Sequence, residues 1–101
     1  MQLKYSKEAQ KDLEIIAYDG HIRFGEARSM LYLKSIEETA KIILSFPEIG
    51  KIPFPEDAPE TRSTRSGMHL VFYEITADMI LINAIIYGRA NTQEILASRR
   101  Y

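Results

Sequence analysis

Two long segments with the apolar spacing of helices, residues 7–24 and 26–45, are separated only by Gly25. In the first segment apolar or small side chains recur three or four positions apart, and Ser6 stands where it can cap the first free backbone amides. A connection of one glycine leaves two such helices no arrangement except a sharp reversal. The sequence therefore predicts an antiparallel helical hairpin whose apolar face the rest of the chain must cover.

The apolar spacing changes to two from Arg62 onward, which is the spacing of strands. Strands are predicted at residues 62–65, 68–75 and 79–87, with turns between them, the first turn at Ser66-Gly67. The last of these segments is apolar almost throughout, as is typical of a central strand that is covered on both faces.

Two shorter elements complete the predicted order. Residues 2–5 alternate in polarity and read as a strand, and Thr92 can cap a final helix that begins at Gln93. We therefore expect one α+β domain over residues 1–101, in which the N-terminal strand and the helical hairpin pack on a small antiparallel β-sheet, followed by a short C-terminal helix.

Composition excludes several kinds of site. Cysteine is absent, so disulfides and thiolate metal sites cannot form. The two histidines, His21 and His69, lack the spacing of a metal site, and the glycines are isolated, so we expect neither a metal nor a cofactor. The start of the chain lacks a signal segment, and no run approaches the roughly 20 apolar residues of a membrane helix. A cytoplasmic protein without a membrane partner is expected.

Polar and cationic side chains flank the strands at one end of the predicted sheet. Arg65 ends one strand, His69 begins the next and Tyr87 ends the last, so antiparallel pairing would bring them near one another. Such a group can cleave RNA, with cations stabilising the phosphate and His or Tyr moving protons. It can also form a contact surface for a protein partner, where Arg and Tyr are favoured, or simply finish the strands.

Three stretches, YSKEAQKDLEII, FPEIGK and RSGMHLVFYEI, follow one another along most of the chain. Their most informative residues are Ser6, Ala9, Asp12, Leu13, Ile16, Phe24, Gly25, Tyr32, Ile36, Pro47, Gly50, Gly67, His69, Phe72 and Tyr73. In this order and spacing the chain resembles the ParE branch of the RelE/ParE toxin superfamily. It departs from the family in an expanded acidic loop around its last three prolines, and in Tyr87 where the final strand commonly ends in a histidine.

The resemblance implies the toxin half of a bacterial type II toxin-antitoxin pair. ParE-like members inhibit DNA gyrase, which implies gyrase, and within it the A subunit, as the target of a binder that needs no catalytic residue of its own. The resemblance also implies neutralisation by a ParD-like antitoxin in a hetero-oligomer, and a role in plasmid stabilisation. Two alternatives remain open: a RelE-type ribosome-dependent mRNA endoribonuclease, and an inert relative that only pairs with its antitoxin.

The net charge of the chain favours gyrase over the ribosome as the target. The formal net charge is −1, whereas an enzyme that enters the ribosomal A site meets dense phosphate and would gain from a cationic excess. Cations nevertheless gather late in the sequence, and the expected target-binding residues are Arg62, Arg65, His69, Tyr87, Arg89, Arg99, Arg100 and Tyr101. The expected antitoxin-binding residues are a second apolar stripe of the first helix, Ile15, Tyr18 and Ile22, together with Leu31 or Leu33 of the second helix. The alternative is that these residues only pack the two helices against each other.

Overall fold

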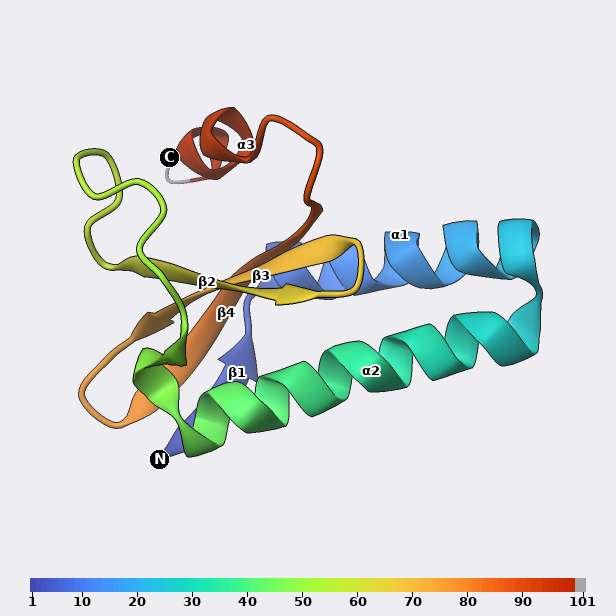
Figure 1. The fold of residues 1–101 in the computed structure, drawn as a ribbon, viewed down its shortest axis with the longest axis horizontal. Coiled ribbons are helices and arrows are strands. Elements are labelled where there is room, and N and C mark those ends of the chain that lie inside the picture. Colours follow the sequence, from blue (N-terminus) through green and yellow to red (C-terminus); the bar gives the residue numbers. More distant parts are fainter. Residues whose placement is uncertain (100–101) are drawn as a thin grey trace.

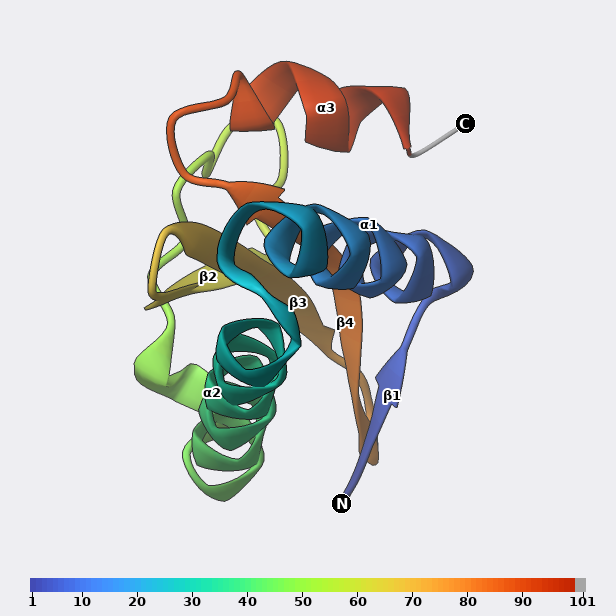
Figure 2. The same cartoon turned by 90° about the vertical axis from the view of Figure 1, so that its right-hand side faces the viewer.

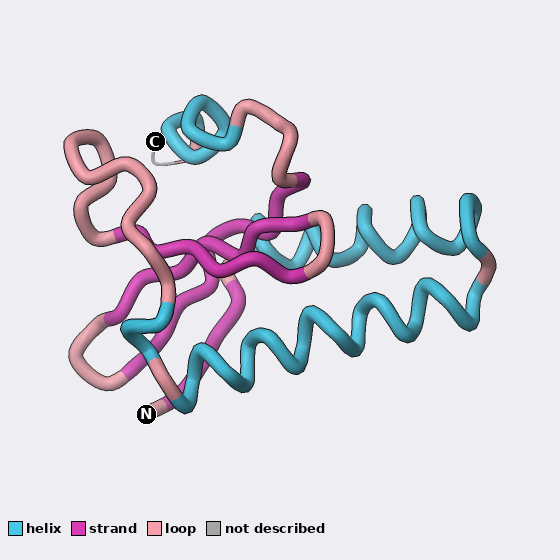
Figure 3. Tube along the Cα trace, viewed as in Figure 1, coloured by secondary structure: helices cyan, strands magenta, loops and turns pink. Residues whose placement is uncertain are grey.

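The structure is a computed structural model, and it describes residues 1–99. Its elements are β1 (Gln2–Tyr5), α1 (Lys7–Phe24), α2 (Glu26–Ser45), the short 3-10 helix η1 (Pro47–Ile49), β2 (Thr61–Ser66), β3 (His69–Ile75), β4 (Met79–Tyr87) and α3 (Thr92–Ser98). Figures 1 and 3 show the hairpin of α1 and α2, the sheet, and the long loop that leads into β2. The predicted order of elements and the α+β class are confirmed.

The helical hairpin begins and reverses where local chemistry requires it. The hydroxyl oxygen of Ser6 accepts a hydrogen bond from the backbone N–H of Ala9, which caps α1. Gly25 has a φ of 88° between the two helices, a conformation that glycine adopts without strain. Ser29 then donates to the carbonyl oxygen of Ala17 at 3.0 Å and holds the two helices together.

The four strands form one sheet in the order β1-β4-β3-β2, which can be followed in Figure 2. β4 is central, as predicted, and a core lies on each face of the sheet. One core joins the sheet to α1 and α2 through Ala9, Ile36, Ala40, Ile43, Val71, Tyr73, Ile80, Ile82 and Ile85. The other contains Phe72, Ala84, Ile86 and Leu96, with Phe54 of the long loop packed against it. The helical hairpin and α3 therefore cover opposite faces.

Two details of the predicted fold are wrong. The sheet is mixed rather than antiparallel, because β1 pairs in parallel with β4 after the chain has passed through the whole hairpin. The N-cap of α3 is Asn91 and not Thr92, because the Asn91 side-chain oxygen accepts from the backbone N–H of Glu94. The Asn91 side-chain amide also donates to the Glu94 carboxylate, so both the oxygen and the nitrogen of the Asn91 side chain are hydrogen-bonded to Glu94.

Candidate functional site: a groove beside the helical hairpin

The far half of the helical hairpin extends beyond the sheet, as Figure 1 shows. A groove of about 1170 Å³ opens there between α1, α2 and the turn that joins β2 to β3. Its lining includes Ile15, Tyr18, Phe24, Arg28, Leu31, Tyr32, Met68, His69 and Tyr87. The groove therefore joins residues of the predicted antitoxin set to residues of the predicted target set.

The hairpin wall of the groove is apolar and exposed. Ile15, Tyr18 and Leu31 have exposed fractions of 66%, 71% and 68%, although large apolar side chains are usually buried in a folded chain. Ile22 is equally exposed but does not line the groove, and Leu33 is half-buried outside it. An exposed apolar patch of this kind typically marks an interaction site.

The sheet end of the groove holds a cluster of Tyr32, His69 and Tyr87, which we call the aromatic cluster. The Tyr32 hydroxyl lies 2.5 Å from Nδ1 of His69 and accepts from the backbone N–H of Met68 at 3.0 Å. His69 and Tyr87 face each other across β3 and β4, with ring centroids 6.0 Å apart. The predicted approach of His69 and Tyr87 therefore occurs, with Tyr32 of α2 as a third member.

Sequence reasoning missed the role of Tyr32. In the sequence, Tyr32 is one of several partly apolar positions of a predicted helix. The groups that its hydroxyl contacts lie more than thirty residues away, on the two sides of the β2–β3 turn. The signal that the sequence does carry is that Tyr32 is one of the residues on which the resemblance to the ParE branch rests.

Replacing Gly67 by alanine is expected to disturb the aromatic cluster. Gly67 has a φ of 59°, and a Cβ there would lie 2.7 Å from a ring carbon of Tyr32. The left-handed conformation alone costs about 1–2 kcal/mol, and the collision adds to it. Gly67→Asn separates the two effects, because asparagine tolerates the conformation but keeps the Cβ. Urea unfolding should show both variants destabilised, alanine more; an unchanged Gly67→Asn would contradict the collision.

Burial lowers the pKa of His69 below the ordinary value of 6.5, and the carboxylate of Asp12 opposes the shift. The folded chain thus binds this proton less readily than the unfolded chain, so the free energy of unfolding should fall as the pH drops from 6.5 through the lowered pKa. Urea unfolding across this range should show a shallower fall in His69→Gln than in wild type, while His21→Gln should follow wild type. A ring titration of His69 above 6.5 would contradict the account.

Arg65 lies at the same end of the sheet but on the opposite face. It pairs with Leu70, whereas His69 pairs with Ser66, and successive residues of a strand point to opposite faces. The Arg65 guanidinium rests against the β4–α3 loop, where a Cβ on Gly88 would lie 3.1 Å from its Nη1. The predicted meeting of Arg65 with His69 and Tyr87 is therefore wrong in its geometry.

Arg62 belongs neither to the aromatic cluster nor to the contact of Arg65 with the β4–α3 loop. Its Nη1 donates to the carbonyl oxygens of Gly50 at 2.8 Å and Glu48 at 3.3 Å, so this guanidinium holds the segment around η1 against β2. Arg89 is exposed in the loop after β4 and forms no ion pair with any described residue. Of the predicted cations described here, Arg65 and Arg89 therefore remain available to a partner.

Arg99 is occupied inside the protein. Its two guanidinium nitrogens Nη1 and Nη2 donate to the two carboxylate oxygens of Asp12 at 2.7 and 2.8 Å, and this raises the pKa of Arg99 above its ordinary value. Asp12 also accepts from the backbone N–H of Ile85 at 2.9 Å. Asp12 thus joins α1, β4 and the end of α3. The remaining predicted target residues, Arg100 and Tyr101, lie outside the described residues.

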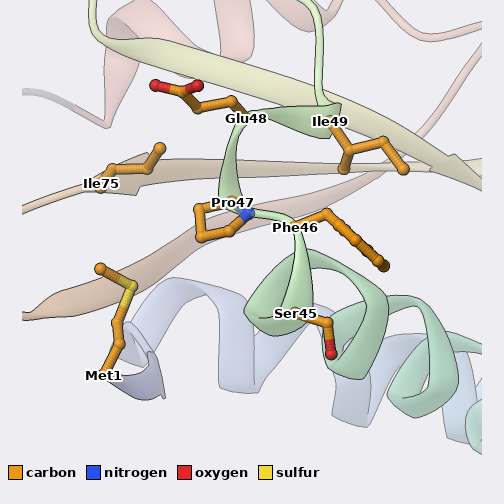
Figure 4. A pocket seen from close by; sticks show the side chains of 7 residues that line it. All are labelled: Met1, Ser45, Phe46, Pro47, Glu48, Ile49 and Ile75. Carbon is orange, nitrogen blue, oxygen red and sulfur yellow. The ribbon is translucent and has the colours of Figure 1, made fainter.

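A second hollow, of about 800 Å³, lies at the other end of the molecule near the N-terminus (Figure 4). It is lined by Met1, Ser45, Phe46, Pro47, Glu48, Ile49 and Ile75. Among the described residues that line this hollow, Glu48 is the only one with an ionisable side chain. The hollow therefore has fewer groups that could bind an ion or transfer a proton than the groove has.

Residues 1–99 hold no group of three side chains placed to bind a metal ion. Nor does that part of the chain contain a helix with the length and apolar character needed to cross a membrane.

The chain matches the profile of the ParE toxin of type II toxin-antitoxin system, parDE, over residues 3–92. Its fold is similar to that of a solved structure described as the chromosomal ParDE TA system from P. aeruginosa, with a TM-score of 0.75 and 20% sequence identity. The similarity covers 86% of this chain and 95% of that chain. No curated protein matches the chain. Because the profile spans most of the sequence, including the groove and the aromatic cluster, the chain belongs to the ParE toxin family of type II toxin-antitoxin systems.

Proposed function

We propose that this toxin inhibits DNA gyrase by binding to it, through the A subunit, and that a ParD-like antitoxin neutralises it by occupying the groove beside the helical hairpin. The observation that supports antitoxin binding at this site is the hairpin wall of the groove. Its residues Ile15, Tyr18 and Leu31 are apolar and exposed, and they line the groove. An amphipathic segment that is disordered when free can fold onto such a wall. The proposed site of action is the bacterial cytoplasm.

The position of the aromatic cluster supports neutralisation by direct covering. His69 and Tyr87 lie in the same groove as the hairpin wall, so a segment bound there would also contact the cluster and the exposed Met68 beside it. Arg65 and Arg89 lie outside this groove lining. We therefore propose that the antitoxin covers part of the target surface and leaves its cations outside the contact.

Gyrase binding is proposed to use the edge formed by Arg65, Met68 and Arg89, with Tyr87 beside it. Family membership supports the target, and the formal charge of −1 supports a protein target over the dense phosphate of the ribosome. Such a binder inhibits only if it prefers one conformational state of gyrase over another. The proposed inhibition traps gyrase in the state in which its bound DNA is cleaved.

Replacing both Arg65 and Arg89 by alanine is expected to weaken inhibition of gyrase supercoiling by about tenfold or more, since interface arginines often contribute over about 1 kcal/mol each. The measurement is the toxin concentration that halves supercoiling by purified gyrase. Lys41→Ala is the matched control, because Lys41 is exposed on the hairpin, lies outside the groove lining and is paired with Glu37 and Glu38. Equal weakening by the control would contradict a specific role for the edge.

Ribosome-dependent mRNA cleavage is the second candidate, and the aromatic cluster favours it. A neutral histidine bonded to a tyrosine can move protons at a phosphate. Arg65 and Arg62 do not supply the cation that the phosphate needs, because Arg65 points to the other face and Arg62 is bonded to η1, which leaves Arg28 of the groove lining as the candidate. Cleavage of mRNA in a translating extract, with no effect on gyrase, would establish this candidate and overturn the proposed function.

A further inference from the structure

Two polar groups of the aromatic cluster lack a hydrogen-bond partner within residues 1–99. His69 uses Nδ1 to contact the Tyr32 hydroxyl, and its Nε2 has no hydrogen bond to any of residues 1–99. The hydroxyl of Tyr87 likewise bonds to nothing in that part of the chain, and Tyr87 is 39% exposed. Both side chains line the groove between the hairpin and the sheet. A bound segment would therefore meet polar atoms beside the apolar wall.

The hydrogen bonds of Tyr32 bear on which nitrogen of His69 carries the proton. The Tyr32 oxygen accepts from the backbone N–H of Met68, so its own proton can go to His69 Nδ1 at 2.5 Å or to the carbonyl oxygen of Ser66 at 3.3 Å. Donation across the shorter distance makes Nδ1 an acceptor, and a neutral ring then carries its proton on Nε2, the nitrogen without an internal partner. Donation to Ser66 instead leaves Nδ1–H to donate to the Tyr32 oxygen.

The ring is neutral near pH 7 because burial lowers the pKa of His69, although the Asp12 carboxylate opposes the shift. Tyr32 from α2 and Tyr87 from β4 contact the ring.

We propose that His69 is a specificity-determining residue: Tyr32 fixes its Nε2–H as a hydrogen-bond donor, which reads an acceptor oxygen on the antitoxin segment in the groove. This inference rests on the proposed antitoxin site. A partner that buries the apolar wall without placing an oxygen beside His69 would desolvate this donor and leave it unpaired, which is unfavourable. The donor therefore selects partners whose oxygen is in register with the apolar side chains that cover Ile15, Tyr18 and Leu31.

The acceptor can be a carboxylate or a main-chain carbonyl. Arg28 on α2 lines the groove and forms no ion pair within residues 1–99, and Glu14 on α1 forms none either, so the local charge does not choose between a carboxylate and a carbonyl. Replacing the acidic residues of the antitoxin by their amides identifies the source. Weaker binding that is specific to toxin with His69 intact assigns a carboxylate, and unchanged binding assigns the main chain.

The first test is a nitrogen-15 NMR spectrum of the histidine rings at about pH 7.5, above the ordinary histidine pKa. The chain has two histidines, and the exposed His21 serves as the internal reference. His69 is expected as the Nε2–H form in the free chain, and its Nε2 proton is expected to shift and exchange more slowly in complex with the ParD-type antitoxin. An Nδ1–H form in the free chain would overturn the assignment of the donor, whether or not the antitoxin binds.

The second test is the dissociation constant for the antitoxin. His69→Ala is expected to raise it about tenfold, as for the loss of one buried hydrogen bond, and Tyr32→Phe severalfold by freeing the ring proton. His21→Ala should leave it unchanged. Wild-type affinity in folded His69→Ala would overturn the specificity role while leaving the proposed antitoxin site intact. Failure of the wild-type chain to bind the antitoxin would overturn both.

Discussion

Replacing Asp12 by alanine is expected to lower the free energy of unfolding by about 3–5 kcal/mol, the usual cost of removing one partner of a buried ion pair. The Asp12 side chain is 10% exposed, and its loss leaves both the Arg99 guanidinium and the Ile85 backbone N–H without their acceptor. Arg99 keeps 26% exposure, so water can partly solvate it and the lower end of the range applies. Urea unfolding followed by circular dichroism measures the change.

The matched control is Asp19→Ala. Asp19 also pairs with an arginine, Arg23, at 2.9 Å, but the two side chains are 57% and 66% exposed. An exposed pair of this kind contributes about 0–1 kcal/mol. Asp12→Ala should also speed amide exchange in α3, because Arg99 anchors the end of that helix. Similar losses for both variants would contradict the structural role given to Asp12.

The double substitution Tyr18→Asp with Leu31→Asp is expected to weaken binding of the ParD-type antitoxin by at least about 100-fold. The two side chains lie on α1 and α2 in the hairpin wall of the groove, and each is an exposed apolar contact of the size that dominates interfaces. Charging both places carboxylates in an apolar contact, which costs at least about 1.4 kcal/mol per site. Isothermal titration with purified antitoxin gives the dissociation constant.

Met30→Asp controls for a general effect of charge on the hairpin. Met30 is 62% exposed on α2 and does not line the groove. Its affinity for the antitoxin should therefore remain within about threefold of wild type, as is usual for a surface residue outside an interface. Because the substituted side chains are already exposed, all three sites should tolerate aspartate without unfolding. If Met30→Asp weakened binding as much as the groove variant, the antitoxin would bind elsewhere on the hairpin.

The helical hairpin was predictable from sequence because its signals are local. Ser6 caps α1 through a bond to a residue three positions away, and Gly25 supplies the positive φ between the helices. A local count also showed that the apolar sector of the first helix, with Ile15, Tyr18 and Ile22, is wider than a single sheet contact requires, but it did not show that these side chains are exposed.

Contacts between distant residues were not predictable in the same way. Arg99 and Asp12 are 87 residues apart, and no local pattern indicates that the last helix packs where its arginine reaches α1. The strand ends indicated that Arg65, His69 and Tyr87 lie at one end of the sheet, but they did not state which face each side chain occupies. A turn at Ser66-Gly67 and the observed pairing of Ser66 with His69 both put Arg65 on the face opposite to His69.

The pairing of β1 was likewise not predictable from the local sequence. Its alternating pattern identifies a strand but does not state which neighbour it pairs with or in which direction. In the structure β1 pairs in parallel with β4, at the edge of the sheet opposite to β2. The aromatic cluster likewise needed three elements in place before Tyr32 could be linked to His69.

Supercoiling of DNA by purified gyrase, with and without this toxin, tests the proposed function most directly. We expect loss of supercoiling with accumulation of cleaved DNA bound to gyrase, and recovery when the ParD-type antitoxin is added in equimolar amount. A parallel assay of mRNA in a translating extract should show no cleavage. Intact supercoiling together with cut mRNA would contradict the account and assign the aromatic cluster to RNA cleavage.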